Sequence, residues 1–304
     1  MLDIALRLLP VFALIALGAG VARTKLLSAE GWQGLERINY WVLFPALLFA
    51  SIVSADISRG DAGRLALAVI AADVVIALAV LGARPFLRLS GPAFTSVFQG
   101  SVRWNGYVGL GLAGSLLGDA GLGLAAVAAA VLVPLNNLMS VYVLSRFAGA
   151  RPASIGQTLR SIAFNPLILA TVSGGLMLAA GLQPPRAVLE TLDLLGRATI
   201  ALGLLCVGAA MDLGPLRRAG VTVLSTAAVK LLVAPALAFG ACLALGLTGA
   251  PMVAAVLCMA APLAPSSYIL ARQLGGDATL AANLVTATTL LSLVTVPLAL
   301  ALVR

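Results

Sequence analysis

The stretch SVRWNGYVGLG, residues 101–111, decides how the rest of this sequence is interpreted. It lies inside a long apolar run, yet it places Arg103, Trp104 and Asn105 side by side and follows them with three glycines. Glycine loosens a helix because it restricts the backbone least. A charged residue is costly in apolar surroundings unless it finds a partner. The stretch therefore predicts a break in an otherwise apolar helix.

The composition predicts that this helix lies in a membrane. Of 304 residues, 61% are apolar and 10% are charged, whereas a soluble domain carries about 25% charged residues. The net charge of +8 would suggest nucleic acid in a soluble protein, but here the basic residues lie in short loops. We therefore expect an all-α polytopic protein of the cell inner (plasma) membrane, with the lipid bilayer as its solvent and no nucleic-acid partner.

A membrane helix needs about 20 mostly apolar residues. A window of that length predicts ten spans, at 3–22, 36–54, 63–83, 93–117, 121–145, 160–180, 188–211, 219–246, 250–273 and 277–303. Only GDAG and GGDA separate the fourth from the fifth span and the ninth from the tenth, so one very long helix at each place is the alternative. A Gly-Asp pair favours a tight turn in which Asp119 and Asp277 cap the next helix.

The loop charges predict the orientation. The loops after the odd-numbered spans, with the adjoining helix ends, hold most of the basic residues: Arg23, Lys25, Arg37, Arg84, Arg88, Arg146, Arg151, Arg160, Arg217, Arg218 and Arg272. The opposite side holds Arg59, Arg64, Arg186 and Arg304. Because cytoplasmic loops carry the excess of Lys and Arg, we expect both termini on the outer side.

The chain contains an internal repeat. A shift of 158 positions lays LLGDAGLGLAAVAA from Leu116 over LGGDATLAANLVTA from Leu274 and superposes the Gly-Asp-Ala of each segment. Each half holds five predicted spans, an odd number, so the two copies have opposite orientations. The sequence thus predicts a first inverted repeat over 1–146, a cytoplasmic connecting loop over 147–159 and a second inverted repeat over 160–304. This architecture is typical of secondary transporters, whose sites form at interrupted helices near the midplane.

The same shift places Trp104 on Pro262 and Tyr107 on Pro265, within APLAPSSYIL. Proline removes a backbone donor and clashes with the preceding helical turn, so a second break is predicted in the ninth span. Freed backbone groups are tolerated in a membrane only when they face protein or a wet cavity. Either break alone is also compatible with a harmless kink, but two at equivalent positions favour a binding site.

Five motifs resemble the auxin efflux carrier family, which comprises the plant auxin carriers and their bacterial relatives. In chain order they are INYWVLFPALLF from Ile38, IAAD at 70–73, NPLILATVSGG from Asn165, KLLVAP from Lys230 and APLAPSSYILARQ from Ala261. The resemblance covers nearly the whole chain. It implies two inverted five-helix repeats, with a scaffold of the first, second, sixth and seventh spans. It also implies a transport domain in which the broken fourth and ninth spans cross, and elevator-like transport of organic anions such as auxin, malate or malonate.

The sequence departs from the plant pattern at three motifs. Trp104 stands where the plant carriers have a proline before the substrate-contacting asparagine, and Ala77 replaces a lysine after the IAAD motif. The Asn-Pro-Asn motif is reduced to Asn165 followed by proline and leucine. Auxin itself is therefore not the expected substrate.

Candidate substrate contacts are polar or helix-breaking residues near the two breaks and on neighbouring spans. An amide donates two hydrogen bonds, and a helix start offers free N–H groups and a positive dipole end to an anion. Arg103 either faces the cavity or snorkels to the headgroups, and each Asn can instead hold helices together. The candidates are Asn105, Arg103, Trp104, Gly106, Pro262, Pro265, Ser266, Ser267, Asn39, Asn136, Asn137 and Asn165.

Charged residues inside the predicted spans need partners or water. Asp73 and Lys230 nearly coincide under the repeat shift, so they are predicted to neutralise each other. The alternative is that Asp73 is a protonation site that couples transport to pH. Arg197 follows Asp193 by four residues and Glu190 by seven, which favours a local ladder of ion pairs.

Together these features predict a secondary carrier of a small organic anion, a mono- or dicarboxylate. The alternative is a sodium-coupled organic-anion symporter resembling the bile-acid symporter family; proton or sodium coupling stays open, as does a homodimer. A passive channel and a membrane enzyme are weaker alternatives. The chain has no histidine and no HExxH or GxSxG motif, so the usual catalytic groups are missing. No metal or cofactor is expected, and Cys206, Cys242 and Cys258 lie in apolar runs without CxxC spacing.

Overall fold

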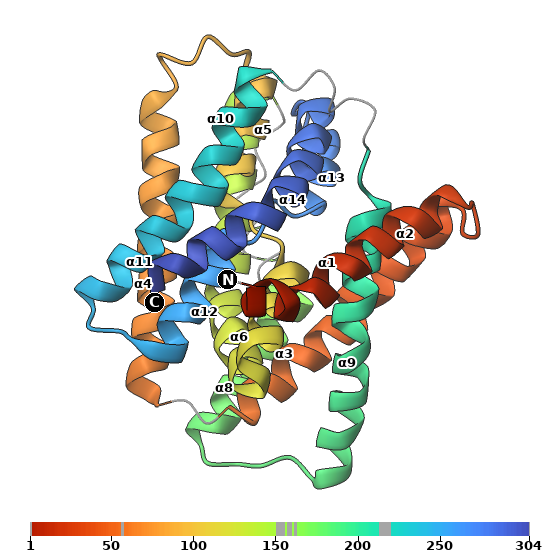
Figure 1. The fold of residues 1–304 in the computed structure, drawn as a ribbon, viewed down its shortest axis with the longest axis vertical. Helices are drawn as coiled ribbons and strands as arrows, with labels where there is room; N and C mark the ends of the chain where they lie inside the picture. The colour runs from red at the N-terminus through yellow and green to blue at the C-terminus, as the bar shows by residue number, and fades with distance from the viewer. Residues whose placement is uncertain are drawn as a thin grey trace.

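The computed structural model describes residues 2–55, 58–149, 156, 160, 163–212 and 220–303. All regular structure within these ranges is helical (Figure 1). Seven of the described helical segments are long and apolar enough to cross a membrane, and Pro166–Ala179 and Gly249–Ala260 are shorter apolar helices. The predicted class, an all-α polytopic membrane protein, is confirmed. The division into ten spans and two repeats stays a prediction.

The helices of the first half are α1 (Leu2–Arg23), α2 (Ala29–Ile38), the π-helical turn η1 (Asn39–Leu43), α3 (Phe44–Val53), α4 (Arg59–Ala83), α5 (Gly91–Val102) and α6 (Gly106–Phe147). Those of the second half are α8 (Pro166–Ala179), α9 (Arg186–Ala209), α10 (Val221–Ala228), the π-helical turn η3 (Val229–Val233), α11 (Ala234–Ala244), α12 (Gly249–Ala260), α13 (Ser266–Gln273), α14 (Ala278–Leu300) and the 3₁₀ turn η4 (Ala301–Val303). The first π turn joins α2 to α3 in one run, Ala29–Val53, and the second joins α10 to α11 in another, Val221–Ala244.

Polar residues and glycines set several helix boundaries. Ser58 caps α4 by accepting a hydrogen bond from the backbone N–H of Asp61, and Asp277 caps α14 by accepting one from Leu280 at 2.9 Å. The predicted cap by Asp277 is therefore confirmed. At the equivalent joint the turn lies at Gly118, which has φ 62° and ψ −146° inside α6. Among the described contacts, Asp119 makes no such cap, so glycine alone produces this turn, by adopting a positive φ.

Each π turn precedes a proline by a fixed distance. Asn39 begins η1 and Pro45 follows in α3, while Val229 begins η3 and Pro235 follows in α11. Proline cannot donate its share of the helical ladder, and a π turn is one way for a helix to absorb that disruption. Both prolines lie in the motifs INYWVLFPALLF and KLLVAP, but nothing in these motifs predicts the π turns.

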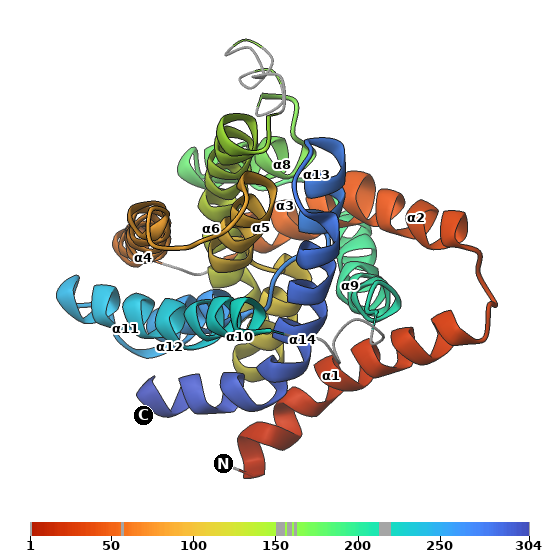
Figure 2. The same cartoon turned by 90° about the horizontal axis from the view of Figure 1, so that it is seen from above.

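The helices form two groups that meet along α6. In the first group α1 packs along α9, and α3 packs against both α8 and α9. In the second group α11 packs against α4 and α12, and α13 packs against α14. Seen from above, α1, α2 and α9 lie on one side and α4, α10, α11 and α12 on the other (Figure 2). The helix α6 contacts members of both groups, so residues on its two faces connect them.

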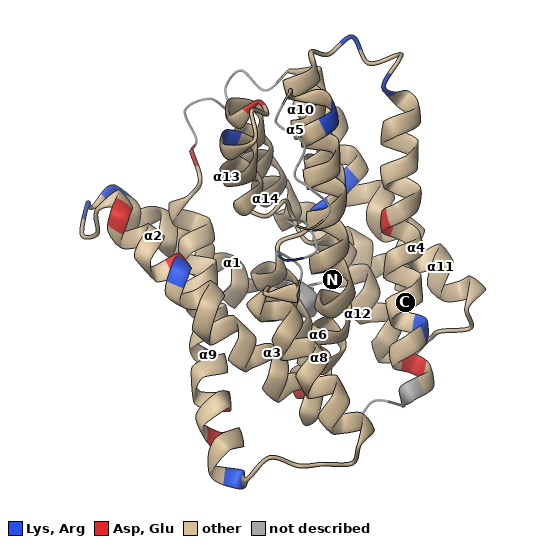
Figure 3. Cartoon of the chain, turned by 180° about the vertical axis from the view of Figure 1, so that it is seen from behind, with Lys and Arg blue, Asp and Glu red and all other residues tan. Residues whose placement is uncertain are grey.

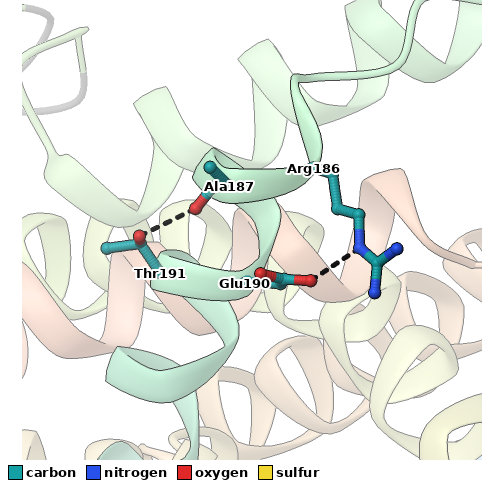
Figure 4. A network of polar contacts seen from close by, with 4 residues as sticks. All are labelled: Arg186, Ala187, Glu190 and Thr191. Atoms are coloured by element: carbon teal, nitrogen blue, oxygen red, sulfur yellow. Dashed lines mark hydrogen bonds and ion pairs between the residues drawn. The ribbon is translucent and has the colours of Figure 1, made fainter.

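Charged residues lie mainly near helix ends and connecting segments (Figure 3). At the start of α9, Arg186 Nε donates to Glu190 Oε1 at 2.7 Å (Figure 4), and one turn later Arg197 pairs with Asp193 at 2.8 Å. The predicted ladder is thus two separate pairs, because Glu190 turns to Arg186 and not to Arg197. All four side chains are largely exposed, so each pair contributes only about 0.3–0.5 kcal/mol.

Part of the predicted orientation lies outside the described residues. Arg151, Arg217, Arg218 and Arg304 fall there, as does most of the connecting loop predicted at 147–159.

Candidate functional site

The first helix break lies where the opening stretch predicted it. The helix α5 ends at Val102 and α6 begins at Gly106, with Arg103 and Asn105 in extended conformations between them. Asn105 Oδ1 accepts hydrogen bonds from the backbone N–H groups of Tyr107 at 3.1 Å and Val108 at 3.3 Å. We expected this helix start to offer free N–H groups to a ligand. That expectation was wrong for these two groups, because the Asn105 side chain already satisfies them.

Trp104 occupies the middle of this break and is 5% exposed. Its indole ring lies against Gly109, and a Cβ added at that position would overlap the ring. Gly106 is similarly close to the Phe44 ring, whose Cζ would lie 3.0 Å from an added Cβ. Glycine at 109 thus serves mainly to leave room for the tryptophan, one helical turn away.

The second break separates α12, which ends at Ala260, from α13, which begins at Ser266. Inside the break, the backbone N–H of Leu263 donates to Thr288 Oγ1 of α14 at 3.1 Å. Pro265 occupies the N-cap position of α13, and no side chain caps that helix. The second break therefore depends on its prolines and on a hydroxyl from a neighbouring helix.

Two hydrogen bonds join the breaks directly. The backbone N–H of Asn105 donates to the carbonyl of Pro262 at 2.8 Å, and Arg103 Nη2 donates to Ser266 Oγ at 3.0 Å. Arg103 Nη1 also donates to Asn137 Oδ1 of α6 at 2.9 Å. With 8% of its surface exposed, Arg103 points into the protein. The alternative in which it snorkels to the headgroups does not hold in this conformation.

A cavity of about 620 Å³ opens where the two breaks and the two helix groups meet. Its walls come from the end of α2, η1 and the start of α3, from both breaks and from the middle of α6. The lining residues are Glu36, Arg37, Tyr40, Trp41, Phe44, Arg103, Trp104, Asn105, Gly106, Tyr107, Val133, Asn136, Asn137, Leu167, Ala264, Pro265, Ser266, Ile269, Leu270 and Gln273. A ligand here would contact residues of both groups at once.

Eight of the twelve candidate contacts line this cavity, and they are Arg103, Trp104, Asn105, Gly106, Asn136, Asn137, Pro265 and Ser266. Asn39 instead donates to the carbonyl of Thr199 at 3.1 Å. Asn165 caps α8 and donates through Nδ2 to Tyr40 Oη at 3.1 Å. Pro262 and Ser267 belong to the second break but do not line the cavity. Asn39 and Asn165 therefore hold helices together here, which was their alternative role.

One face of the cavity is not among the residues predicted from the sequence. Glu36, Tyr40 and Phe44 all line it and follow each other at intervals of four residues. That spacing places them on one helix face, and it was visible in the sequence. Tyr40 lies within electrostatic range of Arg103, and the Phe44 and Tyr107 rings pack with centroids 4.9 Å apart. The aromatic residues thus close the cavity on the side of the first helix group.

Asp73 and Lys230 are both 0% exposed and lie within electrostatic range of each other. Asp73 Oδ2 accepts a hydrogen bond from Asn136 Nδ2 at 2.6 Å. Asp73 Oδ1 and Lys230 Nζ have no hydrogen-bond partner within the described part of the chain. The two charges therefore share one region without a direct ion pair, and Asn136 connects the buried acid to the cavity wall.

Arg103 and Asn105 bring a positive charge and an amide to the cavity wall. Arg103 Nε and Asn105 Nδ2 are buried donors with no partner among the described residues, and both residues line the cavity. Buried donors of this kind are costly unless something accepts their hydrogen bonds. A guanidinium beside an amide matches the paired oxygens of a carboxylate.

Membrane transport proteins are one class of polytopic helical proteins with a polar cavity between two helix groups. Residues 150–300 match a family model described as "Membrane transport protein". Over an alignment of 317 positions, covering 100% of this chain and 97% of its relative, the chain is 28% identical to a protein of Rhizobium meliloti (strain 1021) named "Putative malonate transporter". Both matches are to membrane transport proteins, and they support the resemblance of the motifs to the auxin efflux carriers.

Proposed function

We propose that the protein is a secondary carrier of a small organic anion, a mono- or dicarboxylate. The observation that carries this proposal is the Arg103 guanidinium, which is buried at the junction of the two breaks and lines the cavity. A buried charge persists only with partners, and Asn137 and Ser266 are neutral partners. The positive charge of Arg103 therefore remains available to a carboxylate.

The arrangement of the helices supports an elevator mechanism. In this proposal α1, α3, α8 and α9 form the static scaffold, and the group that carries both breaks moves with the substrate. The cavity lies at the boundary between the groups, with Tyr40 and Phe44 on one wall and Arg103 and Asn137 on the other. Sliding one group past the other would expose these walls to opposite sides of the membrane. The inverted repeat predicted from the sequence supplies the two symmetry-related conformations that such a movement needs.

The relative's name suggests the size of the substrate. Malonate is a short dicarboxylate, and a cavity of about 620 Å³ lies within the range of small-molecule sites. The proposal covers short mono- and dicarboxylates and does not single out malonate.

The direct test is counterflow in proteoliposomes loaded with unlabelled substrate. Each of a panel of labelled mono- and dicarboxylates would be presented outside, and transient accumulation of label would be measured. We expect saturable accumulation of at least one carboxylate. A passive channel gives no counterflow, and failure of every organic anion to accumulate or compete would refute the proposal.

A sodium-coupled symporter is the second candidate, and the buried carboxylate of Asp73 is the observation that favours it. Uptake would be compared with and without an inward sodium gradient, and with and without a proton gradient. Under coupling through Asp73, the Asp73→Asn variant loses the gradient dependence but keeps counterflow. If that variant keeps its full gradient dependence, Asp73 has a structural role beside Lys230.

The proposed orientation places both termini on the outer side and Lys25 in the cytoplasm. All three native cysteines are buried, so a single introduced cysteine can be labelled selectively with a membrane-impermeant thiol reagent on whole cells. Arg186→Cys is expected to react and Lys25→Cys to stay protected until the cells are opened. The reverse pattern would invert the topology.

A further inference from the structure

A carboxylate lines a cavity that otherwise suits anions. Glu36 belongs to α2 and is one of the lining residues, together with Arg37 and Arg103. Within the described part of the chain, these three are the charged side chains of the cavity wall. Their formal charges sum to a single positive charge, so the site as a whole attracts an anion while Glu36 repels one.

Glu36 lies near the first break. It is within electrostatic range of Tyr107, two residues after Asn105, and of Cys206 on α9. Tyr40, one helical turn after Glu36, is within electrostatic range of both Tyr107 and Arg103. The Glu36 carboxylate is thus on the same wall as Tyr40, near the proposed substrate contacts Arg103 and Asn105. The residue is half-buried, which limits the screening of its charge by solvent.

Glu36 is not neutralised by an ion pair in this conformation. No Lys or Arg among the described residues lies within ion-pairing distance of its carboxylate; the described ion pairs join Arg64 to Asp61, Arg186 to Glu190 and Arg197 to Asp193. Arg37 is its chain neighbour, and adjacent residues on a helix do not face each other. The negative charge therefore acts on whatever enters the cavity.

Resting on the proposed function, we propose that Glu36 determines the valence of the transported anion. One carboxylate of the ligand pairs with Arg103, and a second carboxylate would meet the negative charge of Glu36. The site then prefers ligands that carry a single negative charge. A dicarboxylate is accepted best with one carboxyl protonated, because its O–H can donate to the Glu36 carboxylate.

The test compares two ligands with the same carbon skeleton, malonate and its monoamide malonamate. At pH 8 malonate carries two charges and malonamate one. Competition by each against a transported labelled carboxylate would be measured for the wild-type protein and for Glu36→Gln. We expect the wild type to prefer malonamate, and Glu36→Gln to shift the ratio toward malonate by about tenfold, the effect of one charge at close range.

Glu30→Gln is the matched control. Glu30 lies in the first turn of the same helix and does not line the cavity, so its removal changes the net charge of the protein equally. We expect this variant to keep the wild-type ratio. An equal shift in both variants would mean that general surface charge sets the preference, which would overturn the inference.

A second measurement follows the same competition as a function of pH in the wild type and in Glu36→Gln. As pH rises and the second carboxyl of malonate ionises, competition by malonate should weaken relative to malonamate in the wild type. The titratable and charged groups around Glu36 are Arg37, Tyr40, Arg103, Tyr107 and Cys206. They are the same in Glu36→Gln, so the difference between the pH series of the two proteins reports the charge of Glu36.

The outcomes separate this inference from the proposed function. If neither ligand nor any other carboxylate competes in the wild type, both are refuted. If both ligands compete but their ratio is the same in wild type and Glu36→Gln at every pH, only the role of Glu36 is refuted.

Discussion

Both helix breaks free backbone N–H groups from the helical ladder, and each break satisfies them with a different side chain. At the first, Asn105 caps the new helix with its own side chain and Trp104 fills the gap. At the second, Pro262 and Pro265 interrupt the helix and Thr288 of another helix satisfies a freed N–H group. A capped break can carry polar side chains of its own, whereas a proline break depends on its neighbours. The difference concentrates charge and hydrogen-bond donors in the first break.

Because of this difference, the two breaks contribute different groups to the proposed site. Arg103 and Asn105 supply the donors, while the second break contributes the Pro262 carbonyl and the Ser266 hydroxyl that hold them. If the two breaks had equivalent roles, mutations in either break would reduce transport equally. Mutations can therefore show whether the first break binds the ligand and the second positions it.

The largest effect is expected at Arg103. Arg103→Met keeps the aliphatic bulk but removes the charge and the bonds to Asn137 and Ser266. A charge-assisted hydrogen bond contributes about 1.5–3 kcal/mol, so carboxylate counterflow should fall by roughly tenfold to a hundredfold. Arg103→Lys, which keeps the charge but loses the fork geometry, should be intermediate. Wild-type transport by Arg103→Met would move the anion site away from the first break.

Asn105 tests whether capping and binding are separate roles of one side chain. Asn105→Asp keeps an N-cap acceptor for Tyr107 and Val108 but replaces the Nδ2 donor with a negative charge. It should keep its thermal stability and lose most carboxylate transport, by about tenfold or more.

Asn105→Ala is the companion variant, because it removes both the cap and the donor. It should lose transport and also about 0.5–2 kcal/mol of helix stability, measured as thermal stability in detergent. Full transport by either variant would contradict the binding role.

The sequence predicted the breaks well because they are local. Arg103, Asn105, Pro262 and Pro265 interrupt an apolar pattern, and neither helix continues through them. The repeat shift added the long-range information that the two interruptions belong together, and Asn105 does bond to Pro262. Six of the eight candidate contacts that line the cavity belong to these two breaks, and Asn136 and Asn137 come from α6.

The errors came from contacts that no local pattern contains. Asn39 and Asn165 are polar residues in apolar surroundings, but their partners, Thr199 and Tyr40, lie far away in the chain. The free helix start at residue 106 was expected from the backbone alone, and the side chain of Asn105 satisfies two of its groups. Glu36 was passed over because it lies at the predicted end of a span, where a charge needs no explanation.

Trp104 fills the first break where the plant pattern has a proline, and Gly109 leaves room for its ring. An added methyl at Gly109 would overlap the Trp104 ring, so Gly109→Ala should destabilise the protein by about 1–3 kcal/mol through overpacking. Gly175→Ala in α8 is the control, since nothing lies within 4 Å of its added Cβ. The measurement is thermal stability in detergent. Equal stability of the two variants would mean that Trp104 can shift freely.

The smallest effect is expected at the second break, where Thr288 is the neighbour that satisfies the backbone. Thr288→Val keeps the shape but leaves the buried N–H of Leu263 without its partner, at a cost of about 1–3 kcal/mol. The Leu284 carbonyl also loses the bond that it accepts from Thr288 Oγ1, but it keeps its backbone partner within the helix, so that loss adds little. Thr288→Ser retains the hydroxyl and should be close to wild type in thermal stability. If Thr288→Val instead abolished carboxylate transport while keeping its stability, the second break would take part in binding, and the division between a binding break and a positioning break would fail.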